Sequence, residues 1–217
     1  MKEFYPFKIN KLHKKLYDKI CNLVNEKFNL QVENINSICD ENNNKPKAYK
    51  ISIKNSQSIR LDIKHQESVT HLQILVNKYD IEIPKILGVF GKYKFSEWID
   101  GVMLLRVTDV PEVFIASGEM MARLNLIEIQ NKFVSNDEFS LSNAIWTKDK
   151  KVYLIDQGRM KLFENTDDSI ARILMKRIKD KTNIFLFLKG YSKYKNTIHI
   201  ENILKKYDYK WSNYVSK

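Results

Sequence analysis

The sequence predicts an α+β protein built as two lobes. A helical pattern opens the chain, short alternating segments with one helix follow, and the second half is mostly helical with a short hairpin. Such segregation of strands from helices favours α+β over a regularly alternating α/β architecture. We place the lobes at residues 1–98 and 99–217, with Gly101 as a flexible joint between them.

The first lobe is expected to begin with a helix and to continue with an antiparallel sheet. Apolar residues recur at three- and four-residue steps over residues 9–28, which is typical of an amphipathic helix. The polar, proline-containing stretch Asp40–Pro46 predicts an exposed loop. The other predicted elements of this lobe are a helix over 68–79 and strands over 48–53, 59–63, 85–90 and 93–98.

The second lobe is expected to be mainly helical. Residues 116–126 have a strong helical pattern, and residues 167–217 are basic and mostly helical in pattern. Between them, the short apolar segments 144–146 and 152–155 flank a charged turn, which predicts a β-hairpin.

Composition restricts the class of protein. Of 217 residues, 43% are apolar and 29% charged, which predicts a folded chain rather than a disordered one. The longest strongly apolar run, Ile184–Leu188, is far shorter than the ~20 residues that cross a bilayer, and the first residues lack a secretory pattern. Cys21 and Cys39 are too few for a disulfide framework, and the histidines show no zinc-binding spacing. We therefore expect no transmembrane segment and a cytoplasmic location, or one peripheral to the membrane.

The positive charge is concentrated near the end of the sequence. The net charge is +11, and residues 159–217 contribute +8 of it through 14 basic and 6 acidic residues. Lysines alternate with aromatic residues in 189–195 and 205–211. This pattern favours contact with a polyanion such as phosphate, nucleic acid or an acidic membrane. The alternative is that lysine is simply the common surface residue and that the aromatics pack against the lobe.

The residues best suited to catalysis or metal binding lie around the predicted hairpin. The apolar segment 152–155 delivers Asp156 at its end, where a carboxylate can hold a metal ion, and Gly158 allows a sharp turn beside it. Upstream, Asp137 and Glu138 precede Asn143, which enters the other strand. A loop carboxylate, an amide oxygen and a strand-end carboxylate suit a magnesium-phosphate site, although each also fits an ordinary turn.

This order of residues resembles the catalytic segment of the protein-kinase-like fold. It is most similar to the small-molecule branch: aminoglycoside phosphotransferases, choline kinases and lipopolysaccharide-core sugar kinases. The resemblance implies a bilobal fold with a small antiparallel-sheet lobe and a reduced helical lobe, and the helix predicted from the pattern over residues 9–28 precedes them. It also implies ATP and magnesium as cofactors, with Asn143 and Asp156 as the metal ligands.

The resemblance extends upstream to a nucleotide-binding half. Lys64 follows an alternating strand, as does the lysine that holds the ATP phosphates in this family. The segment Ile83–Val89 is similar to a common family segment, and Glu97, Trp98 and Ile99 fall at the hinge whose backbone contacts adenine. The resemblance covers about residues 47–158.

Three features depart from the family pattern. The position of the catalytic aspartate is occupied by Glu138, and a one-residue bulge would place Asp137 there instead, so both carboxylates remain candidates. The stretch Ser37–Pro46, which would cover the phosphates, has no glycine. Glu67 is the candidate ion-pair partner of Lys64, but its place at a helix start equally suits interaction with the helix dipole.

Two hypotheses about function follow. In the first, the protein is a kinase that transfers phosphate from ATP to a hydroxyl of a small molecule, such as a sugar or an envelope glycolipid. In the second, it is a catalytically degenerate nucleotide-binding module, or a module that binds RNA or protein through its basic C-terminal region.

Overall fold

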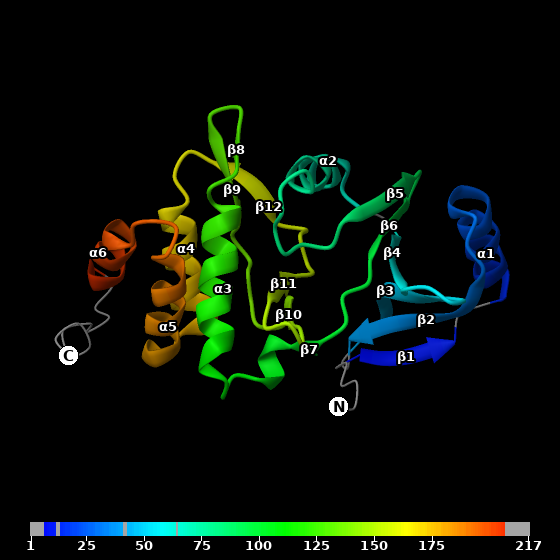
Figure 1. The fold of residues 1–217 in the computed structure, drawn as a ribbon, viewed down its shortest axis with the longest axis horizontal. Helices are drawn as coiled ribbons and strands as arrows, with labels where there is room; N and C mark the ends of the chain where they lie inside the picture. The colour runs from blue at the N-terminus through cyan, green and yellow to red at the C-terminus, as the bar shows by residue number, and fades with distance from the viewer. Residues whose placement is uncertain (1–6, 12–13, 41–42, 64, 207–217) are drawn as a thin grey trace. The chain divides into compact units, whose positions relative to one another are not determined.

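The computed structural model describes residues 7–11, 14–40, 43–63 and 65–206 (Figure 1). These residues form two compact units. One contains the chain up to Thr70 together with Pro84–Asp100, and the other contains His71–Ile83 and the chain from Gly101 onward. The lobe boundaries expected from the sequence stay a prediction.

The first unit contains a six-stranded antiparallel sheet in the order β1-β2-β3-β4-β6-β5. Neighbouring strands are mostly consecutive in the sequence, as hairpin connections favour. The strands are β1 (Phe7–Lys11), β2 (Val32–Asp40), β3 (Asn43–Ile53), β4 (Ile59–Ile63), β5 (Ile86–Phe90) and β6 (Tyr93–Glu97).

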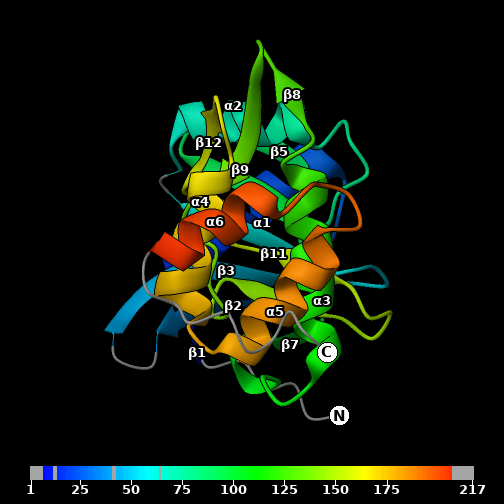
Figure 2. The same ribbon diagram turned by 90° about the vertical axis from the view of Figure 1, so that its left-hand side faces the viewer.

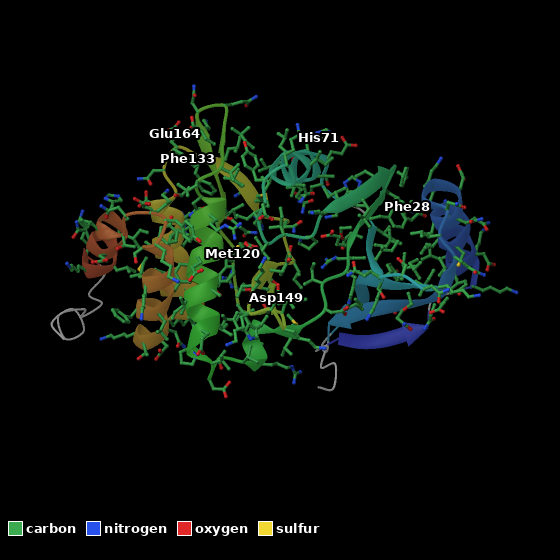
Figure 3. The ribbon with its side chains drawn as sticks, viewed as in Figure 1. Phe28, His71, Met120, Phe133, Asp149 and Glu164 are labelled. Atoms are coloured by element: carbon green, nitrogen blue, oxygen red, sulfur yellow. The ribbon has the colours of Figure 1, made fainter. Side chains whose placement is uncertain are left out.

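Helix α1 (Lys14–Phe28) covers one face of this sheet. Its Ile20 and Val24 are fully buried in one cluster with the apolar strand residues. Phe28, labelled in Figure 3, contacts the rings of Phe90 and Phe95 edge-on, with centroids 5.7 and 5.3 Å away. Because side chains alternate along a strand, Lys50, Arg60 and Asp62 lie on the opposite face of the sheet.

Two local predictions for this unit are wrong. Residues 9–11 belong to strand β1, not to the predicted helix, because their backbone pairs with β2 in the register Ile9↔Ile38. The loop predicted at Asp40–Pro46 is also too long, since β2 extends to Asp40 and β3 begins at Asn43. Residues 12–13 and 41–42 lie outside the described part of the chain. Backbone pairing between strands outweighed the local residue pattern in both cases.

The second unit is built around a pair of packed helices, α3 (Pro111–Leu124) and α5 (Lys181–Tyr191), which lie side by side in Figure 1 and Figure 2. Helix α3 begins at Pro111, five residues before the predicted start, because proline suits the first helical position. The other helices are α2 (Glu67–Val76), which begins in the first unit, a 3₁₀ turn at Leu104–Arg106, α4 (Asp167–Ile173) with a π-helical continuation at Leu174–Ile178, and α6 (Ile198–Lys206).

Two small antiparallel sheets complete this unit, and they carry the candidate site. The first has the order β11-β10-β7, and the second has the order β12-β9-β8. The predicted hairpin is present as β10 (Ala144–Trp146) and β11 (Val152–Leu154). The sequence did not predict the others, which are β7 (Val102–Met103), β8 (Glu128–Ile129), β9 (Lys132–Asn136) and β12 (Met160–Phe163).

The mixture of helices with antiparallel sheets confirms the predicted α+β class, including a helix near the N-terminus. Among the helices that the structure describes, none has the length and apolar character needed to span a bilayer.

Candidate functional site

The β10–β11 hairpin places Asn143 and Asp156 next to each other. Ala144 pairs with Leu154, so the residues just outside this pair continue the same register. The carbonyl oxygen of Asn143 accepts the backbone N–H groups of Ile155 (2.9 Å) and Asp156 (3.4 Å). Asn143, with its amide side chain, and Asp156, with its carboxylate, therefore occupy neighbouring backbone positions at one end of the hairpin.

The turn after β11 presents the carboxylate of Asp156 to solvent. Asp156 is exposed, and its Oδ1 accepts the backbone N–H of Gly158 at 3.1 Å. Gln157 points inward instead: it is 6% exposed, and its Nε2 donates to the carbonyl oxygen of Leu154 at 3.0 Å. A buried glutamine thus holds the turn while the aspartate beside it stays accessible.

Asn136, at the end of β9, connects this turn to the loop that carries the candidate catalytic carboxylates. It is only 1% exposed. Its Nδ2 donates to the backbone oxygen of Asp156 at 3.0 Å, and its Oδ1 accepts the N–H of Glu138 at 3.0 Å. Sequence analysis assigned Asn136 no role, because strand β9, which ends at this residue, was not predicted.

The two candidate carboxylates form different ion pairs with the segment that follows Gly158. Asp137 Oδ2 lies 3.2 Å from Lys161 Nζ on β12, and the Asp137 side chain is 14% exposed. Its other oxygen, Oδ1, is buried without a hydrogen-bond partner among the described residues. Glu138 Oε2 lies 3.3 Å from Arg159 Nε, and both side chains are substantially exposed, at 42% and 58%. Sequence analysis did not single out Arg159 or Lys161.

The loop from Glu138 to Asn143 is held by both apolar and polar contacts. Phe139 is fully buried, and its ring lies 6.3 Å from that of Phe187 on α5. The N–H of Asn143 donates to the Ser140 carbonyl at 2.9 Å, and its Nδ2 approaches the Glu138 carbonyl at 3.5 Å. The loop therefore returns to the hairpin with Glu138 and Asn143 close in space.

The residues present fit a magnesium ion in terms of their chemistry. Magnesium prefers hard oxygen ligands and is often held by one or two carboxylates, substrate phosphates and water. Asn143 Oδ1 and the exposed carboxylate of Asp156 supply such oxygens. No group of three or more His, Cys, Asp or Glu side chains suited to a metal occurs in the described ranges.

The residues predicted to bind nucleotide lie in the first unit. Lys64 is outside the described residues. Glu67 is the exposed first residue of α2. Glu97 ends β6, and its Oε2 accepts the N–H of Lys85 at 3.1 Å. Trp98 donates from Nε1 to Asp100 at 2.9 Å, and Ile99 lies between them in a segment without regular structure. Their roles in nucleotide binding stay predictions.

Solved structures of small-molecule phosphotransferases share this fold. ADP-bound aminoglycoside phosphotransferase APH(2'')-Ib matches with a TM-score of 0.62 and 14% identity, covering 95% of this chain and 93% of that chain. The choline kinase LicA from Streptococcus pneumoniae matches with 0.61 and 13%, covering 88% and 87%. An ethanolamine kinase from Plasmodium vivax matches with 0.65 and 11%, covering 93% and 80%.

The protein thus has the protein-kinase-like fold of small-molecule phosphotransferases, as the sequence pattern predicted. No family model matches the sequence, and no curated protein matches it either. At such low identity the likeness is one of fold.

Proposed function

We propose that this protein is a kinase that transfers a phosphoryl group from ATP to a hydroxyl of a small molecule. The observation that supports it most is the arrangement in the second unit, where backbone hydrogen bonds bring Asn143 beside Asp156 and the Asn136 side chain ties Asp156 to the carboxylate loop. These parts suit phosphoryl transfer, in which proteins contribute mainly positioning and charge stabilisation.

In this proposal, Asn143 and Asp156 hold magnesium through their side-chain oxygens. Bound there, the ion would neutralise charge on the phosphates of ATP. Asn136 fixes the backbone of Asp156 relative to that of Glu138, so that ligand and base keep one spacing. We further propose that Lys64, Glu67 and the segment Glu97–Ile99 bind the nucleotide.

We assign the catalytic carboxylate to Glu138, with Asp137 as the alternative. Glu138 is 42% exposed and can reach an acceptor hydroxyl, whereas Asp137 is 14% exposed and is held by Lys161. The carboxylate of Glu138 would accept the hydroxyl proton as the new bond to phosphorus forms.

The acceptor is proposed to be a sugar or an envelope glycolipid, on the basis of the basic residues after Arg159. The proteins of similar fold carry names that indicate aminoglycoside, choline and ethanolamine acceptors. An acceptor panel should therefore include aminoglycosides, choline and ethanolamine beside sugars and glycolipids. These basic residues would suit an anionic group on the acceptor or a nearby membrane.

The proposal is tested with the Asp156→Asn variant, which keeps the side chain's size but removes its charge. Transfer of radiolabelled γ-phosphate to the acceptor panel, and slow transfer to water, should fall below detection. Asp168→Asn changes an exposed aspartate on α4 and should transfer as the wild type does. Equal turnover by wild type and Asp156→Asn would refute the assignment. Nucleotide binding without transfer in the wild type would favour the degenerate nucleotide-binding alternative.

A further inference from the structure

The loop with the candidate catalytic residues contains no cation. Between the asparagines at its two ends, the segment 136–143 carries two carboxylates, two serines, a phenylalanine and a leucine, and it has no lysine or arginine. Phosphoryl transfer develops charge on the equatorial oxygens, and arginine or lysine side chains commonly stabilise it. If the proposed function holds, such a cation has to come from another segment.

Among the cations of the described residues, Arg159 is the best placed to do so. The turn Gln157–Met160, closed by a 2.9 Å hydrogen bond between its end residues, carries Arg159 at its exposed corner. Asp156 precedes this turn, and β12 begins at Met160, which pairs with Asn136. The backbone is therefore held in place on both sides of Arg159. Its guanidinium contacts Glu138, with Nε 3.3 Å from Oε2.

The contact with Glu138 is one that a phosphate can replace. Both partners are substantially exposed, and ion pairs between exposed side chains are weak. A phosphoryl group offers a guanidinium two oxygens in a planar, bidentate arrangement and more negative charge than one carboxylate. Lys161 is less suited, because it projects from β12 and pairs with Asp137, which is 14% exposed.

We propose that Arg159 is a catalytic residue that rests on Glu138 in the free protein and moves to the γ-phosphoryl group when ATP binds. This inference rests on the proposed kinase function. In the transfer step, the acceptor oxygen forms a bond to the γ-phosphorus, and the bond from that phosphorus to the bridging oxygen breaks. ADP leaves with the electron pair, and the hydroxyl proton passes to Glu138. Arg159 stabilises the charge on the phosphoryl oxygens, and its departure frees the carboxylate.

The test compares MgADP with the imido analogue of MgATP by calorimetry, because only the analogue carries a γ-phosphate. Arg159→Ala should bind MgADP within about two-fold of the wild type and should bind the analogue about ten-fold more weakly, since charge-assisted bonds are the strong ones. Its transfer of phosphate to water should fall by about 100-fold or more, as when a charge-stabilising donor is removed. Arg172→Ala, which removes an exposed arginine from α4, should match the wild type in all three measurements.

A second variant tests the exchange of partners. Glu138→Gln releases Arg159 and should tighten binding of the analogue several-fold while slowing transfer. In the Arg159→Ala background the same substitution should not tighten it, because no guanidinium is left to release. Tightening of equal size in both backgrounds would mean that Glu138 merely repels phosphate, and it would overturn the exchange.

The outcomes separate this inference from the proposed function. A wild type that binds neither MgADP nor the analogue would remove the kinase proposal and this inference with it. A wild type that binds both, with Arg159→Ala unchanged or equally weakened toward both, would leave the kinase proposal standing and overturn the role of Arg159.

Discussion

Glu82 is a buried residue that holds the strand leading to Asp156 in place. It is 7% exposed, and both of its carboxylate oxygens accept hydrogen bonds from Nη1 of Arg123 on α3, at 2.7 and 2.8 Å. Its backbone oxygen accepts the N–H of Leu154 at 3.0 Å, two residues before Asp156. Lys151 lies 3.7 Å from the same carboxylate. Strand β11, which leads to Asp156, is thus anchored through Glu82 to α3.

Arg123→Met should destabilise the protein, because Glu82 would keep a buried charge with one weaker partner. We expect a loss of about 3 kcal/mol in the free energy of unfolding, at the low end for broken buried pairs since Arg123 is 29% exposed. Urea denaturation measures this. The double variant Arg123→Met, Glu82→Gln should recover part of the loss, and the account fails if Arg123→Met alone changes stability by less than ~0.5 kcal/mol.

A second prediction at the residue scale concerns Asp62 and the dependence of stability on pH. Burial alone would raise the pKa of Asp62, but Arg60 (2.9 Å) and Lys94 (3.3 Å) outweigh it and hold the pKa below its ordinary value. The native carboxylate therefore binds a proton more weakly than the unfolded one. The contribution of the ionised carboxylate to folding stability is complete above its pKa in the unfolded chain, about 3.9. It is lost as the pH falls through the lower pKa of the native protein.

The wild type should accordingly exceed Asp62→Asn in stability by about 1–3 kcal/mol at pH 7, and the difference should shrink below about pH 4. Chemical denaturation of both proteins across that range measures the difference. A gap that stays constant from pH 7 to pH 3 would contradict the role given to the ion pairs.

Among the elements, the α3–α5 pair depends on two glycines. A Cβ atom at Gly118 would lie 1.9 Å from the Phe187 carbonyl oxygen, and one at Gly190 would lie 1.9 Å from that of Ile115. The neighbours are backbone atoms, which cannot move without moving a helix. The two helices can therefore pack this closely only because each has a glycine at the contact.

Gly118→Ala should destabilise the protein by about 1–3 kcal/mol through overpacking, although alanine favours helix formation by about 1 kcal/mol. Thermal unfolding of this variant, and of Gly190→Ala, measures the effect. Lys189→Ala, an exposed change on the same α5, should leave stability within about 0.5 kcal/mol. Stabilisation by Gly118→Ala would mean that helix propensity, not close packing, decides at this position.

The elements also show what a sequence pattern can predict. The β10–β11 hairpin was predicted closely because its strands are adjacent and a short turn fixes their register. Strands β9 and β12 were missed, because their pairing joins Asn136 to Met160 across the hairpin. The ion pairs of Asp137 and Glu138 depend on that same pairing, so the residue spacing alone could not reveal Arg159 or Lys161 as partners.

At the scale of the whole molecule, the order of motifs predicted the fold although each motif alone is weak. Asn143 and Asp156 are neighbours as expected, because a local hairpin joins them. The nucleotide-binding residues are harder to predict, since Lys64, Glu67 and Glu97–Ile99 depend on the register of a different unit. Their assignment rests on resemblance, and it requires a measurement on the nucleotide itself.

Calorimetric titration of MgATP into the intact protein and into Asp156→Asn is the most direct test of the kinase proposal. We expect the wild type to bind ATP, this binding to be lost when magnesium is omitted, and Asp156→Asn to bind MgATP at least about ten-fold more weakly. No binding by the wild type at millimolar ATP, or equal and magnesium-independent binding by both proteins, would contradict it.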